Sequence, residues 1–369
     1  MQQSNYKIII SGGGTGGHIF PAIAIAHALK AINQRHDILF VGANGRMEME
    51  KVPAAGFKII GLNIAGLQRS FSLKNFLFPF KLISSLLQAK KIIKDFKPDA
   101  AVGVGGYASG PLLYMAASAN VPCIIQEQNS YPGITNKMLA KKASRICVAY
   151  QGMEKYFPAD KLMLSGNPVR EDLLNITNKS AEAFEYFGLD KNIKTILIVG
   201  GSLGARTINQ SIQQSLDKLF EAGVQVIWQT GKAFYDSAVE SARKYESKIK
   251  VHAFISKMDY AFSVAHVIVS RAGASTISEL CIVGKPCILI PSPNVAEDHQ
   301  TKNAMALVNT NAALMVTDAA CQNDLIAELK SLLNDINLQT QLATNIKKLA
   351  LPGSANAIAN EVISIIQKW

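Results

Sequence analysis

The 369-residue sequence contains none of the short motifs that mark the common metal and phosphate enzymes. It has no D-x-D acid pair, no H-E-x-x-H and no cluster of cysteine and histidine, so no divalent-metal or zinc site is predicted. It also has no G-x-x-x-x-G-K-[ST] loop, which excludes a P-loop NTPase. We therefore predict a chemistry that needs neither a metal nor another cofactor.

Cysteine and long apolar runs are also scarce. The five cysteines include no C-x-x-C pair, and most lie in or beside apolar segments, so we expect buried free thiols in a reducing compartment. No run of about 18 uncharged apolar residues occurs, so no membrane-spanning helix is predicted. The net charge of +11 permits an anionic membrane surface or phosphorylated substrates as partners. Without a recognisable nucleic-acid module, nucleic acid is not expected.

The most informative stretch is KIIISGGGTGGH, from Lys7 to His18. An apolar, β-branched strand ends in five glycines and one threonine, and a helical pattern follows, with Pro21 expected in the first helical turn. Glycines let the backbone approach a ligand closely, and the N–H groups at a helix start favour an anion. This loop is predicted to bind a phosphate or an oxyanion.

A nicotinamide site is the weaker interpretation of the same loop. Gly12, Gly14 and Gly17 do satisfy G-x-G-x-x-G. That motif also requires an acid at the end of the next strand, and the stretch 42–45 after that strand, Gly-Ala-Asn-Gly, contains none.

A second apolar strand running into glycines, at 195–206, indicates the architecture, with a helix expected at 207–219. Two strand–loop–helix units in two halves of similar length predict an α/β protein of two doubly wound, Rossmann-like domains that face a central cleft. We expect an N-terminal domain at 1–170 and a C-terminal domain at 171–353. The last helix, 354–369, is expected to cross back onto the first domain.

Polar residues at the ends of predicted strands and in the loops near them are further candidates for site residues. Glu127 and Asn129 follow a buried strand, where functional groups of parallel sheets collect, although loop solvation would also account for them. Arg170 follows a Gly-Asn-Pro turn near the expected hinge. In the second half, Glu279 lies in the first turns of the helix after a small-residue loop at 270–278. Gln300 belongs to a polar loop at 291–303 that enters another helix.

The stretch 67–96 mixes phenylalanine and leucine with lysine and arginine, and has no acid before Asp95. A core helix at 81–94 with snorkelling lysines is one interpretation. The segment 73–80 is too apolar for open solvent and favours a peripheral anchor on anionic lipid. Basic residues of a later helix could extend this surface: Lys137, Lys141, Lys142 and Arg145.

Eight short segments of the sequence, taken together, resemble the MurG family of peptidoglycan glycosyltransferases. They are Gly13–His18 (GGTGGH), His18–Ala22 (HIFPA), Gly105–Gly110 (GGYASG), Glu127–Asn129 (EQN), Gly166–Arg170 (GNPVR), Gly200–Ser202 (GGS), Arg271–Glu279 (RAGASTISE) and Asp298–Asn303 (DHQTKN). The resemblance spans almost the whole chain. It implies a GT-B fold and an inverting transfer of N-acetylglucosamine from UDP-GlcNAc to lipid I, the undecaprenyl-diphosphate-linked MurNAc-pentapeptide, which gives lipid II.

The resemblance also implies the site residues. The second domain would bind the donor. Arg170, Ser202, Ala274, Ser275 and Thr276 would meet the diphosphate, the backbone of Ile255 the uracil, Glu279 the ribose hydroxyls and Gln300 the sugar. Thr15, Gly16, Gly17 and Asn129 would complete the donor site from the first domain. Where some members carry a second glutamine, this chain has His299, which puts a sugar contact at that position in doubt.

Two residues compete for the role of general base on the acceptor hydroxyl, His18 and Glu127. A positioned imidazole suits a base, although a histidine at a helix start can simply pack. Other interpretations stay open: a lipid glucosyltransferase, a sugar-nucleotide epimerase, or a membrane-binding module without catalysis. The expected location is the cytoplasmic side of the inner membrane, as a peripheral protein, with other cell-wall synthesis proteins left open as partners.

Overall fold

The computed structural model describes residues 4–64, 78–178, 180–201 and 204–369. Contacts divide the chain into two compact units. Unit 1 comprises Met1–Val169 and Gly353–Trp369, and unit 2 comprises Arg170–Pro352. Ser202 and the apolar segment 67–77 lie outside the described residues, so their predicted roles are not addressed by the structure.

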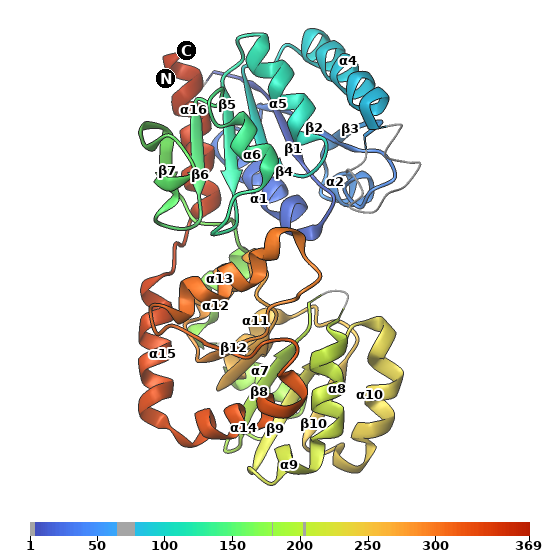
Figure 1. Cartoon of the computed structure of the whole chain (residues 1–369), viewed down its shortest axis with the longest axis vertical. Coiled ribbons are helices and arrows are strands. Elements are labelled where there is room, and N and C mark those ends of the chain that lie inside the picture. The colour runs from blue at the N-terminus through green and yellow to red at the C-terminus, as the bar shows by residue number, and fades with distance from the viewer. Residues whose placement is uncertain (1–3, 65–77, 179, 202–203) are drawn as a thin grey trace. The chain divides into compact units, whose positions relative to one another are not determined.

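Unit 1 is built on a seven-stranded parallel sheet with the order β3-β2-β1-β4-β5-β6-β7 (Figure 1). Its strands are β1 Lys7–Gly12, β2 Asp37–Ala43, β3 Lys58–Leu62, β4 Ala100–Gly105, β5 Cys123–Glu127, β6 Arg145–Val148 and β7 Leu162–Leu164. β1, β4 and β5 are buried along almost their whole length because helices cover both faces, which explains their apolar, β-branched composition. The chain order reverses between β1 and β4, which is where open α/β sheets bind ligands.

The helices of unit 1 lie on two faces of this sheet. They are α1 Gly16–Ile32, α2 Glu48–Ala54, α4 Phe78–Phe96, α5 Ser109–Ser118, α6 Ile134–Leu139 and α16 Ser354–Lys368. One core joins the sheet to α4, α5 and α6, and the other joins it to α1 and α16. α16, red in Figure 1, packs against α1 through Ile358, Val362 and Ile365, which repeat at helical spacing. Arg145 Nε donates to Glu361 Oε1 over 2.7 Å and fixes α16 to β6.

Unit 2 has a six-stranded parallel sheet with the order β10-β9-β8-β11-β12-β13. Its strands are β8 Lys194–Val199, β9 Val224–Gln229, β10 Ile249–His252, β11 Val267–Ser270, β12 Cys287–Leu289 and β13 Leu314–Met315. Its helices are α7 Ser180–Phe187, α8 Arg206–Gln214, α9 Leu216–Phe220, α10 Tyr235–Ala242, α11 Met258–Val264, α12 Ala274–Val283, α13 His299–Val308, α14 Cys321–Asn334 and α15 Ile336–Lys348. The order reverses between β8 and β11, as it does at β1 and β4 in unit 1.

Four local predictions differ from the structure. Arg145, expected on a helix beside the α4 lysines, is the first residue of β6 and pairs with Glu361 of α16 instead. Pro21 lies in the second turn of α1, because the helix begins at Gly16 directly on the glycines. The helix expected at 207–219 is two helices, interrupted at Ser215, where the backbone is not helical. The short edge strand β13 was not predicted, because two residues give no periodic signal. All five cysteines are buried and free, as expected.

Candidate functional site

The glycine loop of unit 1 lies at the point where the strand order reverses. Thr15 is the N-cap of α1, and its carbonyl accepts from the N–H groups of His18 and Ile19. The N–H groups of Gly16 and Gly17 come before these and have no intrahelical acceptor, as in the first turn of any helix. The predicted anion site falls on these two N–H groups, at the N-terminus of a 17-residue helix.

His18 is half-buried beneath this loop. Its Nδ1 lies 3.0 Å from the carbonyl oxygen of Gly13 and 3.5 Å from Oγ1 of Thr15. A carbonyl only accepts, so the contact with Gly13 favours a proton on Nδ1 and puts the lone pair of the neutral ring on Nε2. The ring fits only because Gly105 has no side chain: a Cβ there would lie 2.9 Å from Nε2.

Glu127 is in a different environment from His18, because its carboxylate is 2% exposed and already engaged by four N–H donors. Oε1 accepts from the backbone N–H of Asn129 (3.0 Å) and from its Nδ2 (3.2 Å). Oε2 accepts from Asn136 Nδ2 (2.8 Å) and the Gly133 N–H (3.1 Å). These donors match the roughly four lone-pair sites of a carboxylate. Glu127 therefore holds the 129–133 loop in place, and Asn129 with it.

The Gly-Asn-Pro turn is fastened to the same strand end. Gln126 Nε2 donates to Asn167 Oδ1 over 2.8 Å, and Asn167 Nδ2 donates to the Gln128 carbonyl over 3.0 Å. All three side chains are buried. These hydrogen bonds hold the Gly-Asn-Pro turn against the end of β5 in unit 1.

In unit 2 the structure brings Glu279 and Arg170 together. Arg170 Nε donates to Glu279 Oε1 over 3.0 Å, and the glutamate side chain is 16% exposed against 41% for the arginine. Burial raises the pKa of the Glu279 carboxyl, while Arg170 opposes that rise. Glu279 lies in the second turn of α12, whose half-buried first residues are Ala274, Ser275 and Thr276. The N-cap of this helix is Gly273, and its carbonyl accepts from the Ile277 N–H.

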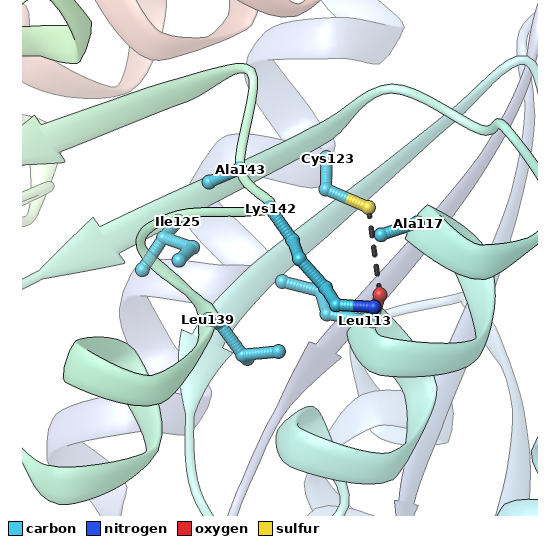
Figure 2. Close-up of a pocket in the computed structure, with 7 residues that line it drawn as sticks. All are labelled: Leu113, Ala117, Cys123, Ile125, Leu139, Lys142 and Ala143. Atoms are coloured by element: carbon cyan, nitrogen blue, oxygen red, sulfur yellow. Dashed lines mark hydrogen bonds between the residues drawn. The ribbon is translucent and has the colours of Figure 1, made fainter.

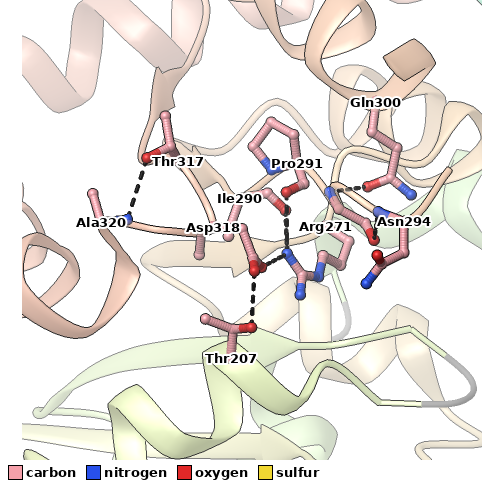
Figure 3. Close-up of polar contacts among 10 residues, drawn as sticks. Thr207, Arg271, Ile290, Pro291, Asn294, Gln300, Thr317, Asp318 and Ala320 are labelled. Carbon is pink, nitrogen blue, oxygen red and sulfur yellow. Dashed lines mark hydrogen bonds and ion pairs between the residues drawn. The ribbon is translucent and has the colours of Figure 1, made fainter. Parts of the chain in front are cut away.

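Ile255 and Gln300 are also held by neighbouring loops. The Ile255 N–H donates to Gln229 Oε1 over 2.9 Å, so any backbone contact it makes with a base has to come from its carbonyl. Gln300 Oε1 accepts from the Ser292 N–H over 2.9 Å, which directs the carboxamide oxygen at the 291–298 loop (Figure 3). His299 is the first residue of α13, directly before Gln300.

An ion pair that sequence reasoning missed joins the loops of unit 2. Arg271 Nη1 donates to Asp318 Oδ1 (2.5 Å) and to the carbonyls of Ile290 (3.1 Å) and Pro291 (3.2 Å). Asp318 Oδ2 accepts from Thr207 Oγ1 over 2.9 Å (Figure 3). The pair thus links residues that follow β8, β11, β12 and β13. Arg271 stood in a recognised motif, but nothing in the sequence links it to an aspartate 47 residues away.

Exposed apolar and basic side chains lie on α4, on α6 and just after α6 in unit 1. Phe80, Ile83 and Leu87, spaced along one stripe of α4, are 68%, 57% and 64% exposed, and Ile134 and Met138 of α6 are 64% and 76% exposed. We name these the α4–α6 patch, together with the exposed lysines Lys81, Lys90, Lys91, Lys94, Lys141 and Lys142. Among the described residues, no helix is long and apolar enough to cross a membrane.

A small crevice lies between α5, β5 and α6, beneath Lys142 (Figure 2). It is lined by Leu113, Ala117, Cys123, Ile125, Leu139, Lys142 and Ala143. The Lys142 ammonium lies 4.2 Å from the centre of the Tyr114 ring, which is itself 46% exposed. This part of unit 1 therefore offers apolar lining with a cation beside it.

Two parallel-sheet α/β units, each with a glycine loop where the strand order reverses, have the architecture of the GT-B class of glycosyltransferases. Residues 8–148 match the Glycosyltransferase family 28 N-terminal domain, and residues 195–359 match the family 28 C-terminal domain. The chain belongs to glycosyltransferase family 28.

Two curated relatives and one solved structure match this chain over almost its whole length. The chain is 57% identical to a protein of Parabacteroides distasonis over 98% of this chain and 99% of that one, and 56% identical to one of Phocaeicola vulgatus over 100% and 98%. Both are named UDP-N-acetylglucosamine--N-acetylmuramyl-(pentapeptide) pyrophosphoryl-undecaprenol N-acetylglucosamine transferase. The crystal structure of Acinetobacter baumannii MurG is similar, with a TM-score of 0.80 and 27% identity over 98% of this chain and 100% of that one.

Proposed function

We propose that this chain transfers N-acetylglucosamine from UDP-GlcNAc to the muramyl sugar of lipid I, inverting the anomeric centre and forming lipid II for peptidoglycan synthesis. The observation that carries this proposal is the likeness to N-acetylglucosamine transferases across 98% of the chain, which includes the glycine loop of unit 1 and the α12 region of unit 2. A UDP-GlcNAc 2-epimerase has the same fold at 15% identity, which supports the fold alone.

Unit 2 binds the donor in this proposal. The first N–H groups of α12, at Ala274, Ser275 and Thr276, stabilise the diphosphate, as helix N-termini do for anions. Glu279 accepts from the ribose hydroxyls, and Arg170, already paired with Glu279, extends its remaining guanidinium donors to the diphosphate. The Ile255 carbonyl accepts from uracil, and the Gln300 amide group donates to the sugar. The proposed contact of Ser202 with the diphosphate rests on the family resemblance alone.

Unit 1 supplies the base. We assign this role to His18 rather than Glu127, because Nε2 carries the lone pair of the neutral ring, whereas the Glu127 carboxylate already accepts from four N–H donors. Asn129, Thr15, Gly16 and Gly17 contact the donor from this side. Glu127 contributes by holding Asn129 in position.

These residues account for the proton transfer and for the bond made and the bond broken in the proposed reaction. The acceptor hydroxyl gives its proton to Nε2 of His18 as its oxygen bonds to the anomeric carbon. The bond from that carbon to the diphosphate oxygen breaks, and UDP leaves with the electron pair. Helix N–H groups and Arg170 stabilise the charge that develops on the diphosphate, which is the contribution a metal ion makes in other transferases.

The α4–α6 patch brings the enzyme to its lipid substrate. Exposed apolar side chains insert at an interface, and each lysine near an anionic surface adds about 1 kcal/mol. The protein is thus a peripheral one on the cytoplasmic side of the inner membrane, where other cell-wall synthesis proteins act.

Release of UDP tests the proposed reaction. With UDP-GlcNAc present, the purified protein should release UDP only when lipid I is added, and at the rate at which lipid I is consumed. UDP release at the same rate without any acceptor would contradict the proposal, and so would the absence of release with lipid I in detergent micelles.

A further inference from the structure

Glu48, at the start of α2, is a buried carboxylate behind the glycine loop of unit 1. It is 1% exposed. Its Oε2 accepts from the Gly14 N–H over 2.9 Å, and its Oε1 accepts from the Ala43 N–H over 3.0 Å. One oxygen therefore holds the loop, and the other holds the end of β2.

The peptide group between Gly13 and Gly14 connects Glu48 to His18. Its N–H, on Gly14, donates to Glu48, and its carbonyl, on Gly13, accepts from His18 Nδ1 over 3.0 Å. Amide resonance joins the two ends of this peptide, so an anion at the N–H increases the negative charge on the carbonyl oxygen. That carbonyl then becomes a stronger acceptor for the Nδ1 proton.

The packing leaves little freedom in this arrangement. A Cβ on Gly13 would lie 2.2 Å from Glu48 Oε1, and a Cβ on Gly106 would lie 2.4 Å from the Gly13 carbonyl oxygen. The Gly13 N–H also donates to the Gly105 carbonyl over 3.3 Å. The peptide is therefore held from both sides in the orientation that joins the carboxylate to the imidazole.

We propose that Glu48 is a positioning residue for His18 and acts through the Gly13–Gly14 peptide. It fixes the Nδ1–H tautomer before the reaction and stabilises the imidazolium that forms when Nε2 takes the acceptor proton. This inference rests on the proposed role of His18 as base, but the link between Glu48 and the ring can be measured without catalysis.

The variant Glu48→Gln tests the link. A carboxamide has a single acceptor oxygen, so it cannot accept from both the Gly14 and Ala43 N–H groups. The measurement is the ¹⁵N NMR spectrum of the histidine ring nitrogens in the ligand-free full chain, assigned with His18→Ala. We expect the wild type to show Nδ1–H for His18 and the variant to show a mixture of tautomers. We also expect kcat to fall roughly 10- to 100-fold, the loss typical when the hydrogen-bond partner behind a metal-bound histidine is removed, with the donor KM little changed.

Glu50→Gln is the matched control, because Glu50 lies in the same helix but is exposed and pairs with its neighbour Lys51. It should change neither the tautomer nor kcat. Glu48→Asp, which keeps the charge, should restore the Nδ1–H tautomer in part, and it replaces the glutamine variant if that one does not fold. In a His18→Ala background, Glu48→Gln should have no further effect on kcat.

The inference is overturned if His18 keeps its tautomer and kcat in a folded Glu48 variant, because Glu48 would then only anchor the loop. A different result separates the two proposals. If the tautomer shifts but His18→Ala retains wild-type kcat, the link from Glu48 to the ring stands, while the role of His18 as base and the catalytic part of this inference fail.

Discussion

Glu279 and Arg170 are 109 residues apart in the sequence and meet in unit 2, with Arg170 Nε 3.0 Å from Glu279 Oε1. The glutamate is thereby oriented before any ligand binds. Burial raises the pKa of this carboxyl, and the arginine keeps it from rising further. Glu279 is thus a half-buried, oriented carboxylate in the second turn of α12, and in the proposed donor site it accepts from the hydroxyls of the ribose.

Replacing Glu279 by glutamine should therefore weaken UDP binding. A charge-assisted hydrogen bond contributes about 1.5–3 kcal/mol, so the Kd should rise roughly 10- to 150-fold. Calorimetry of UDP binding to the folded variant measures this, with Glu240→Gln, an exposed glutamate paired with Arg243, as the control.

Because the pKa of Glu279 is raised, the affinity of the wild type for UDP should also begin to fall on acidification while the pH is still above the ordinary glutamate value of 4.5. Retained affinity with a lowered apo Tm would make Glu279 a stabilising helix residue only.

Replacing His18 by alanine should reduce kcat more than it raises the donor KM. A positioned general base contributes roughly 10²- to 10⁴-fold. The measurement is steady-state kinetics with lipid I at saturating UDP-GlcNAc, with His27→Ala, an exposed histidine further along α1, as the control. A kcat within about threefold of wild type would remove His18 from the chemistry.

The α4–α6 patch should bind anionic vesicles. Changing Phe80 and Leu87 to serine and Lys81 to glutamate removes two exposed apolar side chains and reverses one charge, so partitioning onto phosphatidylglycerol vesicles should fall while UDP binding stays the same. Ile336→Ser, which alters a 69% exposed side chain of unit 2, is the control. If the triple variant sediments with vesicles as well as the wild type does, the α4–α6 patch is not the lipid contact.

Breaking the pair of Arg271 and Asp318 should loosen the donor loops. Their side chains are 14% and 20% exposed, so Asp318→Ala should cost about 2 kcal/mol, less than the 3–5 kcal/mol of a fully buried pair. The donor KM should rise because the residues after β11, β12 and β13 lose their common anchor. Asp217→Ala, which breaks the exposed pair with Lys244, should affect neither Tm nor KM. Equal kinetics for both variants would show that the pair does not organise the donor site.

Acid should destabilise unit 1 through His36. Its Nδ1 accepts from the Tyr6 N–H over 3.1 Å, and burial lowers its pKa below 6.5, so the folded form holds the neutral ring. Below pH 6.5 the unfolded chain binds more protons, and the free energy of unfolding falls as pH decreases toward the lowered pKa. A loss of about 1 kcal/mol lowers the Tm of a domain of this size by about 2–4 °C.

Thermal unfolding from pH 7 to pH 5 tests this point. His36→Asn keeps an acceptor at the position of Nδ1 but does not titrate, so its Tm should depend less on pH than that of the wild type. An equally steep decline in both proteins would assign the acid sensitivity to other groups.

Much of the fold could be predicted from the sequence, because parallel strands buried on both faces are nearly continuous apolar runs and their loops are marked by glycine. The strand–glycine–helix pattern predicted the two loops at which the strand order reverses for the same reason. Glu48 and Asp318 were not found. An acid at a helix start ordinarily compensates the dipole, and a loop aspartate is ordinarily solvated, so neither stands out until folding brings in Gly14 or Arg271. The donors to Glu127 were not predicted either, because Gly133 and Asn136 lie on a loop and a helix whose return to the strand end has no local signal.

Analysis of the product tests the central claim most directly. Full-length protein would be incubated with UDP-GlcNAc and lipid I, and the lipid fraction examined by mass spectrometry and NMR. The account predicts a lipid that has gained one N-acetylhexosamine in β linkage to the muramyl sugar, with one UDP released for each lipid converted and no change in the sugar nucleotide without acceptor. Conversion of UDP-GlcNAc to another sugar nucleotide in the absence of lipid, or a product with the retained α configuration, would contradict it.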